Sequence, residues 1–163
     1  MKKSILLNAF CGTSAELLVK DIKDYETLLL PNNKVQDSKM LLERILLSEY
    51  DYILAFGQRP NIKDKVHIET MARDGEACLK TDFDCELLQQ LFFQNGIPAK
   101  LSYNAGTSFC NRLYWSGLQY LMENQKDKKT KMVFIHIPFK KNISDFGVFK
   151  ERVFETVRLF VEK

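Results

Sequence analysis

The feature that most constrains the fold is an alternation of short apolar segments with longer segments whose apolar residues recur at helical spacing. Short apolar runs bounded by turn residues indicate strands, and a period of 3.6 residues indicates helices that bury one face. Strands are predicted at residues 4–8, 25–30, 52–56, 65–71, 99–103 and 132–137, and helices at residues 13–20, 38–49, 83–94, from 110 onward and 144–162. This alternation predicts an α/β protein whose sheet carries helices on both faces.

Local signals set the predicted ends of several elements. Gly57 is predicted to end the strand before it, and Ser38 to cap the second helix. Residues 73–77 are predicted to lead directly into the next helix. The buried face of the second helix is predicted to consist of Leu41, Leu42, Ile45 and Leu46.

The composition excludes several classes of partner. The 163 residues contain 24 basic and 21 acidic side chains, and a net charge of +3 is too small to indicate binding to nucleic acid. No apolar run approaches membrane-spanning length, so no membrane partner is expected. The basic residues cluster only at 126–131, which we interpret as a solvated loop.

No linker or internal repeat divides the chain, so residues 1–163 are predicted to form a single domain.

The cysteines and the N-terminal segment indicate a cytoplasmic location. The four cysteines, at positions 11, 78, 85 and 110, have no zinc-binding or CxxC spacing, although Cys78 and Cys85 could in principle pair. Residues 1–7 resemble the start of a signal peptide, but Asn8 interrupts the apolar run and no cleavage site follows. A buried first strand explains this segment better, and a reducing cytoplasm is the default expectation.

The segment 102–111, together with His136, indicates the chemistry. A short strand runs into the turn-prone sequence Asn104-Ala105-Gly106-Thr107, and Cys110 then stands where a helix must begin. The positive end of a helix dipole and its unpaired N–H groups favour a thiolate, which is the reactive form. The same N–H groups suit the oxyanion of an acyl-transfer transition state. With a histidine on a later strand as the base, this is the layout of a cysteine hydrolase.

Three segments resemble those of the pyroglutamyl peptidase I family, the pyrrolidone-carboxylate peptidases. Residues 96–111 resemble its nucleophile segment, residues 134–138 its Phe-Ile-His-x-Pro segment, and residues 56–58 with 68–72 its acidic segment. The resemblance implies a single-domain, three-layer α/β/α sandwich with a mostly parallel, mixed central sheet of the phosphorylase/hydrolase-like kind. It also implies a peptidase that removes an N-terminal pyroglutamyl residue and works as a homo-oligomer, a dimer or tetramer, without cofactor or metal.

The resemblance assigns roles to residues. Cys110 is expected to be the nucleophile, His136 the base and later the acid, and Glu69 the carboxylate that orients the histidine. The substrate site is expected to include Phe10, Gln58 and Asn104.

Each assignment has a plainer alternative. Cys110 could be an inert core cysteine, His136 a histidine bonded to backbone at a strand end, and Glu69 an exposed strand residue. His67 could compete for Glu69, line the substrate pocket or face solvent, and we expect it to be non-catalytic. The protein as a whole could be an amidase or thioesterase for another small acyl group, or a non-catalytic binding protein on the same scaffold.

Overall fold

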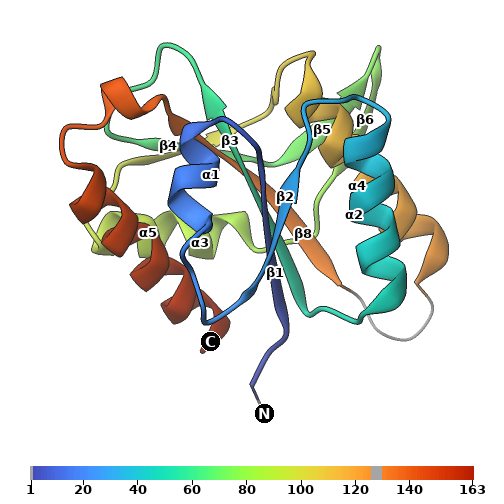
Figure 1. The fold of residues 1–163 in the computed structure, drawn as a ribbon, viewed down its shortest axis with the longest axis horizontal. Coiled ribbons are helices and arrows are strands. Elements are labelled where there is room, and N and C mark those ends of the chain that lie inside the picture. The colour runs from blue at the N-terminus through green and yellow to red at the C-terminus, as the bar shows by residue number, and fades with distance from the viewer. Residues whose placement is uncertain (1, 126–129) are drawn as a thin grey trace.

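The computed structural model describes residues 2–125 and 130–163 and has three layers, with a central sheet between two groups of helices (Figure 1). The strands are β1 (Ile5–Phe10), β2 (Glu26–Leu30), β3 (Tyr52–Arg59), β4 (Val66–Glu69), β5 (Met71–Asp74), β6 (Ala77–Lys80), β7 (Ala99–Ser102) and β8 (Lys131–Pro138). The helices are α1 (Ser14–Val19), α2 (Gln36–Leu47), α3 (Cys85–Gln94), α4 (Phe109–Asn124), a 3₁₀ turn at Lys140–Asn142 and α5 (Phe146–Val161).

The central sheet is mixed but mostly parallel. Its strands follow the order β2-β1-β3-β8-β4-β7, and β5 and β6 form a separate hairpin. The strands β2, β1, β3 and β8 are parallel to one another, β4 is antiparallel to β8, and β7 is parallel to β4. The predicted α/β class and the mostly parallel, mixed sheet are therefore confirmed.

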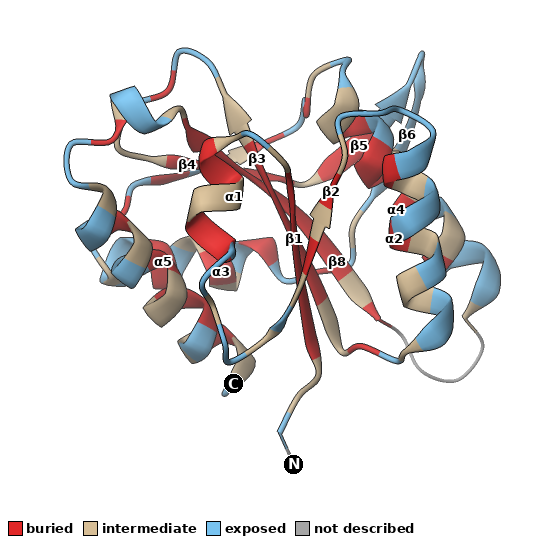
Figure 2. Ribbon diagram, in the orientation of Figure 1, coloured by how far each residue is buried: buried red, intermediate tan, exposed pale blue. Residues whose placement is uncertain are grey.

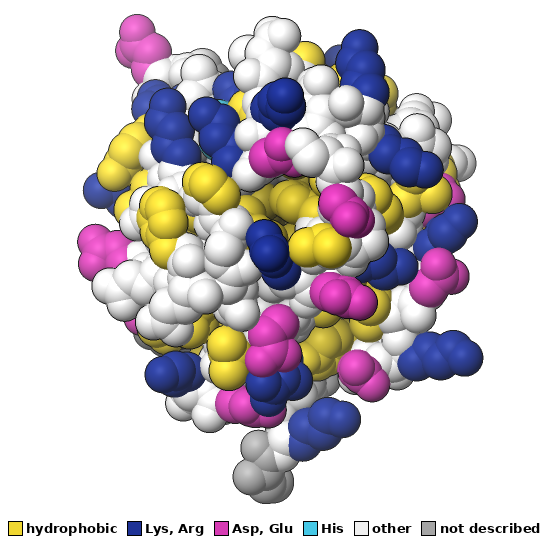
Figure 3. Space-filling view, turned by 90° about the vertical axis from the view of Figure 1, so that its left-hand side faces the viewer, with side chains coloured by type: hydrophobic (Ala, Val, Ile, Leu, Met, Phe, Trp, Pro, Cys, Tyr) yellow, Lys and Arg dark blue, Asp and Glu magenta, His cyan; other side chains and the backbone are white. Residues whose placement is uncertain are grey.

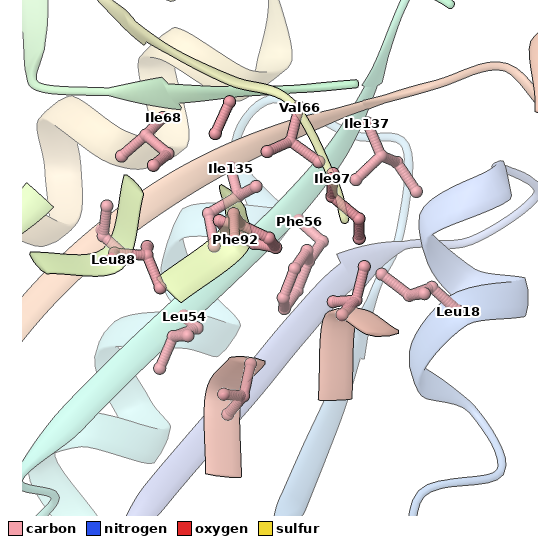
Figure 4. Close-up of a cluster of buried hydrophobic side chains, with 14 of the residues drawn as sticks. Leu18, Leu54, Phe56, Val66, Ile68, Leu88, Phe92, Ile97, Ile135 and Ile137 are labelled. Carbon is pink, nitrogen blue, oxygen red and sulfur yellow. The ribbon is translucent and has the colours of Figure 1, made fainter. Parts of the chain in front are cut away.

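Each face of the sheet has its own apolar core, so the central strands are buried on both sides (Figure 2). This double coverage explains why their sequences are continuous apolar runs instead of alternating patterns. One core lies under α1, α3 and α5, and Figure 4 shows part of it, including Leu18, Leu54, Phe56, Val66, Ile68, Leu88, Phe92, Ile97, Ile135 and Ile137. The other core lies under α2 and α4 and includes Leu6, Leu30, Leu41, Ile53, Ala55, Leu113, Tyr114, Met132 and Phe134.

Side-chain caps fix where three helices begin. The side chains of Thr13, Asp84 and Asp145 accept hydrogen bonds from backbone N–H groups in the first turns of α1, α3 and α5. In the described residues, no helix is both long enough and apolar enough to cross a membrane.

Three local predictions were wrong. Strand β3 does not end at Gly57, because residues 57–59 continue the ladder with residues 136–138 of β8. Helix α2 begins at Gln36 and not after Ser38. At this start the side chain of Asn33 accepts hydrogen bonds from the N–H groups of residues 35 and 36. Residues 73–77 belong to the β5–β6 hairpin instead of leading into α3.

The buried face of α2 is narrower than predicted. Leu41 and Ile45 pack into the core beneath α2 and α4, whereas Leu46 is 74% exposed. The predicted solvated loop lies largely outside the described residues, which omit 126–129.

Candidate active site

Cys110 is the second residue of α4, so the predicted position of this thiol at a helix N-terminus is confirmed. Its sulfur stands directly over β3, at the point where that strand has no side chain. A Cβ at Gly57 would lie 2.7 Å from Cys110 Sγ and 2.8 Å from two ring carbons of Phe134. Glycine is therefore required in the middle of a strand because the thiol and the aromatic ring occupy the space above it.

His136 lies on the same face of the sheet as the thiol, one strand away. It is opposite Gly57 in the parallel β3–β8 register, and neighbouring strands are about 4.8 Å apart. Its Nδ1 is 3.1 Å from Oε2 of Glu69, and both side chains are buried. A proton on Nδ1, donated to Glu69, leaves Nε2 as the basic nitrogen of the ring.

Glu69 ends β4 and is fully buried, so its negative charge needs compensation. Nη1 of Arg59 lies 3.3 Å from Glu69 Oε2 and supplies the compensating positive charge. The hydroxyl of Tyr114 donates a 2.8 Å hydrogen bond to the backbone carbonyl of Glu69. Glu69 is thus held at its carboxylate by Arg59 and His136, and at its backbone carbonyl by Tyr114.

The thiol is protonated at neutral pH in this arrangement. Burial raises the pKa of Cys110 to about 12, and the nearby charge of Glu69 adds to the rise. The backbone N–H of Cys110 and the charge of Arg59 lower the pKa but do not outweigh these effects. The lowering of the pKa expected at a helix N-terminus is thus present, but it is smaller than the rise caused by burial, so the protonated thiol is the prevailing form at neutral pH.

Asn111 ties the nucleophile helix to the hairpin. Its side-chain amide accepts a 2.9 Å hydrogen bond from the backbone N–H of Arg73 and donates a 2.8 Å bond to the carbonyl of the same residue. Both bonds are backbone-specific, so they fix β5 against the first turn of α4 whatever side chain stands at position 73.

The three residues predicted to contact substrate lie in different places. Phe10 is buried, and its ring centroid lies 6.0 Å from that of Phe109, the residue before the thiol. Gln58 is on the opposite face of β3 from Gly57, where its Oε1 accepts a hydrogen bond from the N–H of Ser14. Asn104 is exposed, and its Oδ1 accepts from the N–H of Gly106, which shapes the loop leading to α4. The structure thus brings Phe10 to the thiol helix and does not bring Gln58 there.

The pyroglutamyl peptidase family model matches residues 39–148, which include all three predicted catalytic positions. The chain belongs to this family.

Curated members of the family match at moderate identity. The chain is 32% identical over 105 residues to the pyrrolidone-carboxylate peptidase of Thermosipho melanesiensis, covering 64% of this chain and 49% of that protein. It is 31% identical over 130 residues to the enzyme of the same name from Fusobacterium nucleatum, covering 77% of this chain and 57% of that one. The chain therefore spans about half the length of these relatives.

Solved structures of family members have the same fold. Pyroglutamyl peptidase I from Bacillus amyloliquefaciens superposes with a TM-score of 0.85 at 19% identity, covering 100% of this chain and 97% of that chain. The pyrrolidone carboxyl peptidase of Fervidobacterium islandicum superposes with a TM-score of 0.81 at 20% identity, covering 99% of each chain.

Sequence reasoning missed Arg59 and Tyr114, which contact Glu69 in this group of side chains. A signal for Arg59 existed, because residues 57 and 59 of one strand point to the same face. Tyr114 carried no such signal, since its position in an apolar helical stripe is that of an ordinary core residue.

Other features lie apart from this group. All four cysteines are free thiols, so Cys78 and Cys85 are not paired.

A hollow of about 760 Å³ lies between the N-terminal segment and α5, on the side of the molecule seen in Figure 3. Its lining mixes basic residues, acidic residues and Phe154, and it includes none of Cys110, His136 and Glu69. Among residues 2–125 and 130–163, no cluster of three or more His, Cys, Asp or Glu side chains is arranged to hold a metal.

Proposed function

We propose that the protein is a cysteine peptidase that removes an N-terminal pyroglutamyl residue from peptides. The observation that carries the proposal is the grouping of Cys110, His136 and Glu69 on one face of the sheet of a pyroglutamyl-peptidase fold. The thiol stands over Gly57, the imidazole is one strand away, and Glu69 is 3.1 Å from that imidazole.

In the proposed first step, Cys110 Sγ attacks the carbonyl carbon of the pyroglutamyl residue while His136 Nε2 takes the thiol proton. Glu69 stabilises the resulting imidazolium and keeps its orientation. The backbone N–H of Cys110 is the proposed donor to the oxyanion. Proton transfer during attack agrees with the raised pKa of the thiol, because little thiolate exists beforehand.

The remaining steps return the enzyme to its starting state. Collapse of the tetrahedral intermediate breaks the C–N bond, and His136 gives its proton to the leaving amine, which leaves a thioester on Cys110. A water molecule, deprotonated by His136, then attacks the thioester carbon. Free pyroglutamate leaves, and the proton returns to the sulfur of Cys110.

The proposed contact for the pyrrolidone ring is the aromatic pair beside the thiol. Phe10 and Phe109 meet edge to face at 6.0 Å, and the ammonium of Lys34 lies 5.5 Å from the Phe109 ring centroid. A flat lactam ring suits such an apolar wall. Asn104 is proposed to act by shaping the loop before α4, and Gln58 is left out of the proposed site.

We also propose that residues 1–163 form one domain that works in the cytoplasm as a homo-oligomer. Large apolar side chains near the two ends of α2 support self-association, since Val35 is 73% exposed and Leu47 is 80% exposed. Phe149 and Phe160 of α5 are buried in the core and so are not part of such a surface.

The test is hydrolysis of a pyroglutamyl-linked fluorogenic amide. Wild type and Cys78→Ala, which removes the exposed cysteine of the β5–β6 hairpin, should be active, and Cys110→Ala should be inactive. Glu69→Gln should keep the fold and lose about 10²- to 10⁴-fold in kcat, because His136 would no longer be held in the orientation and tautomer that proton transfer needs. A folded wild type that cleaves other acyl amides but not the pyroglutamyl one would replace the proposed substrate. A folded wild type that cleaves none would refute the peptidase assignment and favour a binding role.

A further inference from the structure

A basic surface pocket of about 340 Å³ lies beside the buried Glu69, at the edge of the sheet formed by β4 and β7. No acidic side chain lines it within the described residues. Its lining consists of Arg59, His67, Arg73, Lys100, Leu101, Ser102, Tyr103 and Asn104. Arg73 and Lys100 are cations, and Arg59 adds N–H donors although its charge also compensates Glu69, so the hollow is suited to an anion.

The buried ring of His67 supports a ligand in this pocket. The side chain is 9% exposed, and neither of its ring nitrogens has a hydrogen-bond partner among the described residues. Buried polar groups are nearly always paired, because an unpaired one keeps the full cost of losing its water. Burial, followed by the charge of Arg59, lowers the pKa of His67, so the ring is neutral at pH 7 and offers one N–H donor.

The two arginines that line the pocket are held in place. Nη1 of Arg59 donates to the carbonyl of Asn104 at 3.0 Å, and Nε of Arg73 donates to the carbonyl of Tyr103 at 3.0 Å. Each guanidinium has further N–H groups beyond these contacts. Donors fixed before the ligand arrives give affinity without a further cost of ordering them.

The pocket lies on the side of the thiol where a peptide's leaving group must be. Along one row across the sheet, Gly57 of β3 pairs with His136 of β8, which pairs with His67 of β4, which pairs with Lys100 of β7. Two strand spacings of about 4.8 Å place His67 about 10 Å from Gly57. Since His136 must protonate the leaving amine, the peptide that follows that amine continues over His136 toward His67.

We propose that this pocket is a subsite for a carboxylate of the bound peptide, two to three residues beyond the bond that Cys110 cleaves. The assignment rests on the proposed peptidase function. The span follows from the distance of about 10 Å and an extended chain's reach of about 3.3–3.6 Å per residue. The carboxylate is either the C-terminus of a short peptide or an acidic side chain in a longer one.

The test measures binding to Cys110→Ala by calorimetry and cleavage by the active enzyme. The first arm compares pyroglutamyl-alanyl-alanine with its C-terminal amide. The second compares pyroglutamyl-alanyl-aspartyl amide with the asparaginyl analogue. We expect about tenfold tighter binding of the carboxylate member in at least one arm, and the responding arm identifies the source of the charge.

Two pocket variants and one control make the test specific. Lys100→Gln removes an exposed charge, and His67→Gln removes the unpaired ring; either should erase most of the preference for the carboxylate. Lys23→Gln, the same change in the exposed loop before β2, should leave it intact. Peptides that are bound and cleaved equally with and without the carboxylate would overturn the subsite alone. If no pyroglutamyl peptide is bound or cleaved, the proposed function fails, and the subsite fails with it.

Discussion

Replacing Gly57 with alanine tests whether the space above β3 positions the nucleophile. The added Cβ would lie 2.7 Å from Cys110 Sγ, whereas ordinary contact begins at 3.4 Å, so the sulfur or the strand must move by 3.4 − 2.7 = 0.7 Å. The same carbon meets the Phe134 ring at 2.8 Å, and this ring is fully buried and has no room to retreat. Overpacking of this kind lowers the free energy of unfolding by about 1–3 kcal/mol.

The loss of activity should exceed the loss of stability. A displacement near 1 Å of a reacting group can cost about 10²-fold in rate, so we expect kcat/KM of Gly57→Ala to fall by about 10- to 100-fold. The assay is hydrolysis of the pyroglutamyl amide at a temperature where denaturant titration shows the variant to be folded.

The matched control is Gly147→Ala in the first turn of α5. Its Cβ would meet nothing closer than 3.6 Å, so stability should be unchanged or slightly raised and activity unaffected. A Gly57→Ala protein with wild-type stability and wild-type kcat/KM would refute the argument that the glycine makes room for the thiol.

Two further predictions follow from the site. Asn111→Ala should lower the free energy of unfolding by about 1–3 kcal/mol, because a buried side chain loses two hydrogen bonds to Arg73. The control Asn124→Ala, at the exposed end of the same helix, should lower it by less than about 1 kcal/mol. Equal effects of the two changes in chemical denaturation would contradict the role of Asn111 in tying α4 to the hairpin. The pKa of Cys110 is raised to about 12, so the rate of its alkylation by iodoacetamide in the substrate-free protein should rise about tenfold per pH unit from pH 7 to 10 without a plateau. The rate is measured by mass spectrometry of the Cys110 peptide. A plateau below pH 8 would show that the thiolate has already formed.

The arrangement of elements was predictable because each long helix and central strand carries its own pattern. Helix α5 buries Phe149, Val153, Val157 and Phe160, the stripe expected from a period of 3.6 residues. The start of α4 at Phe109 was equally clear, since apolar periodicity follows a turn-prone segment.

The wrong predictions share a physical cause: a local rule was overruled by a distant contact. Gly57 carries the usual signal of a strand end, but β8 pairs with it and Cys110 occupies the space that a side chain would fill. The β5–β6 hairpin was missed because it pairs only with itself and is largely exposed, so it lacks the apolar alternation that marks a strand.

The position of β8 has a consequence for how the protein folds during synthesis. It follows every other described strand in sequence, yet it lies between β3 and β4 in the centre of the sheet. Until residues 131–138 leave the ribosome, β2-β1-β3 and β4-β7 have no strand to join them, and β3 and β4 each present an open edge. The two parts of the sheet can therefore join only through a late, non-local pairing with β8, and pairing of this kind is generally slow and leaves strand edges open to aggregation. Because that strand also brings His136, a partly synthesised chain holds the cysteine without its base.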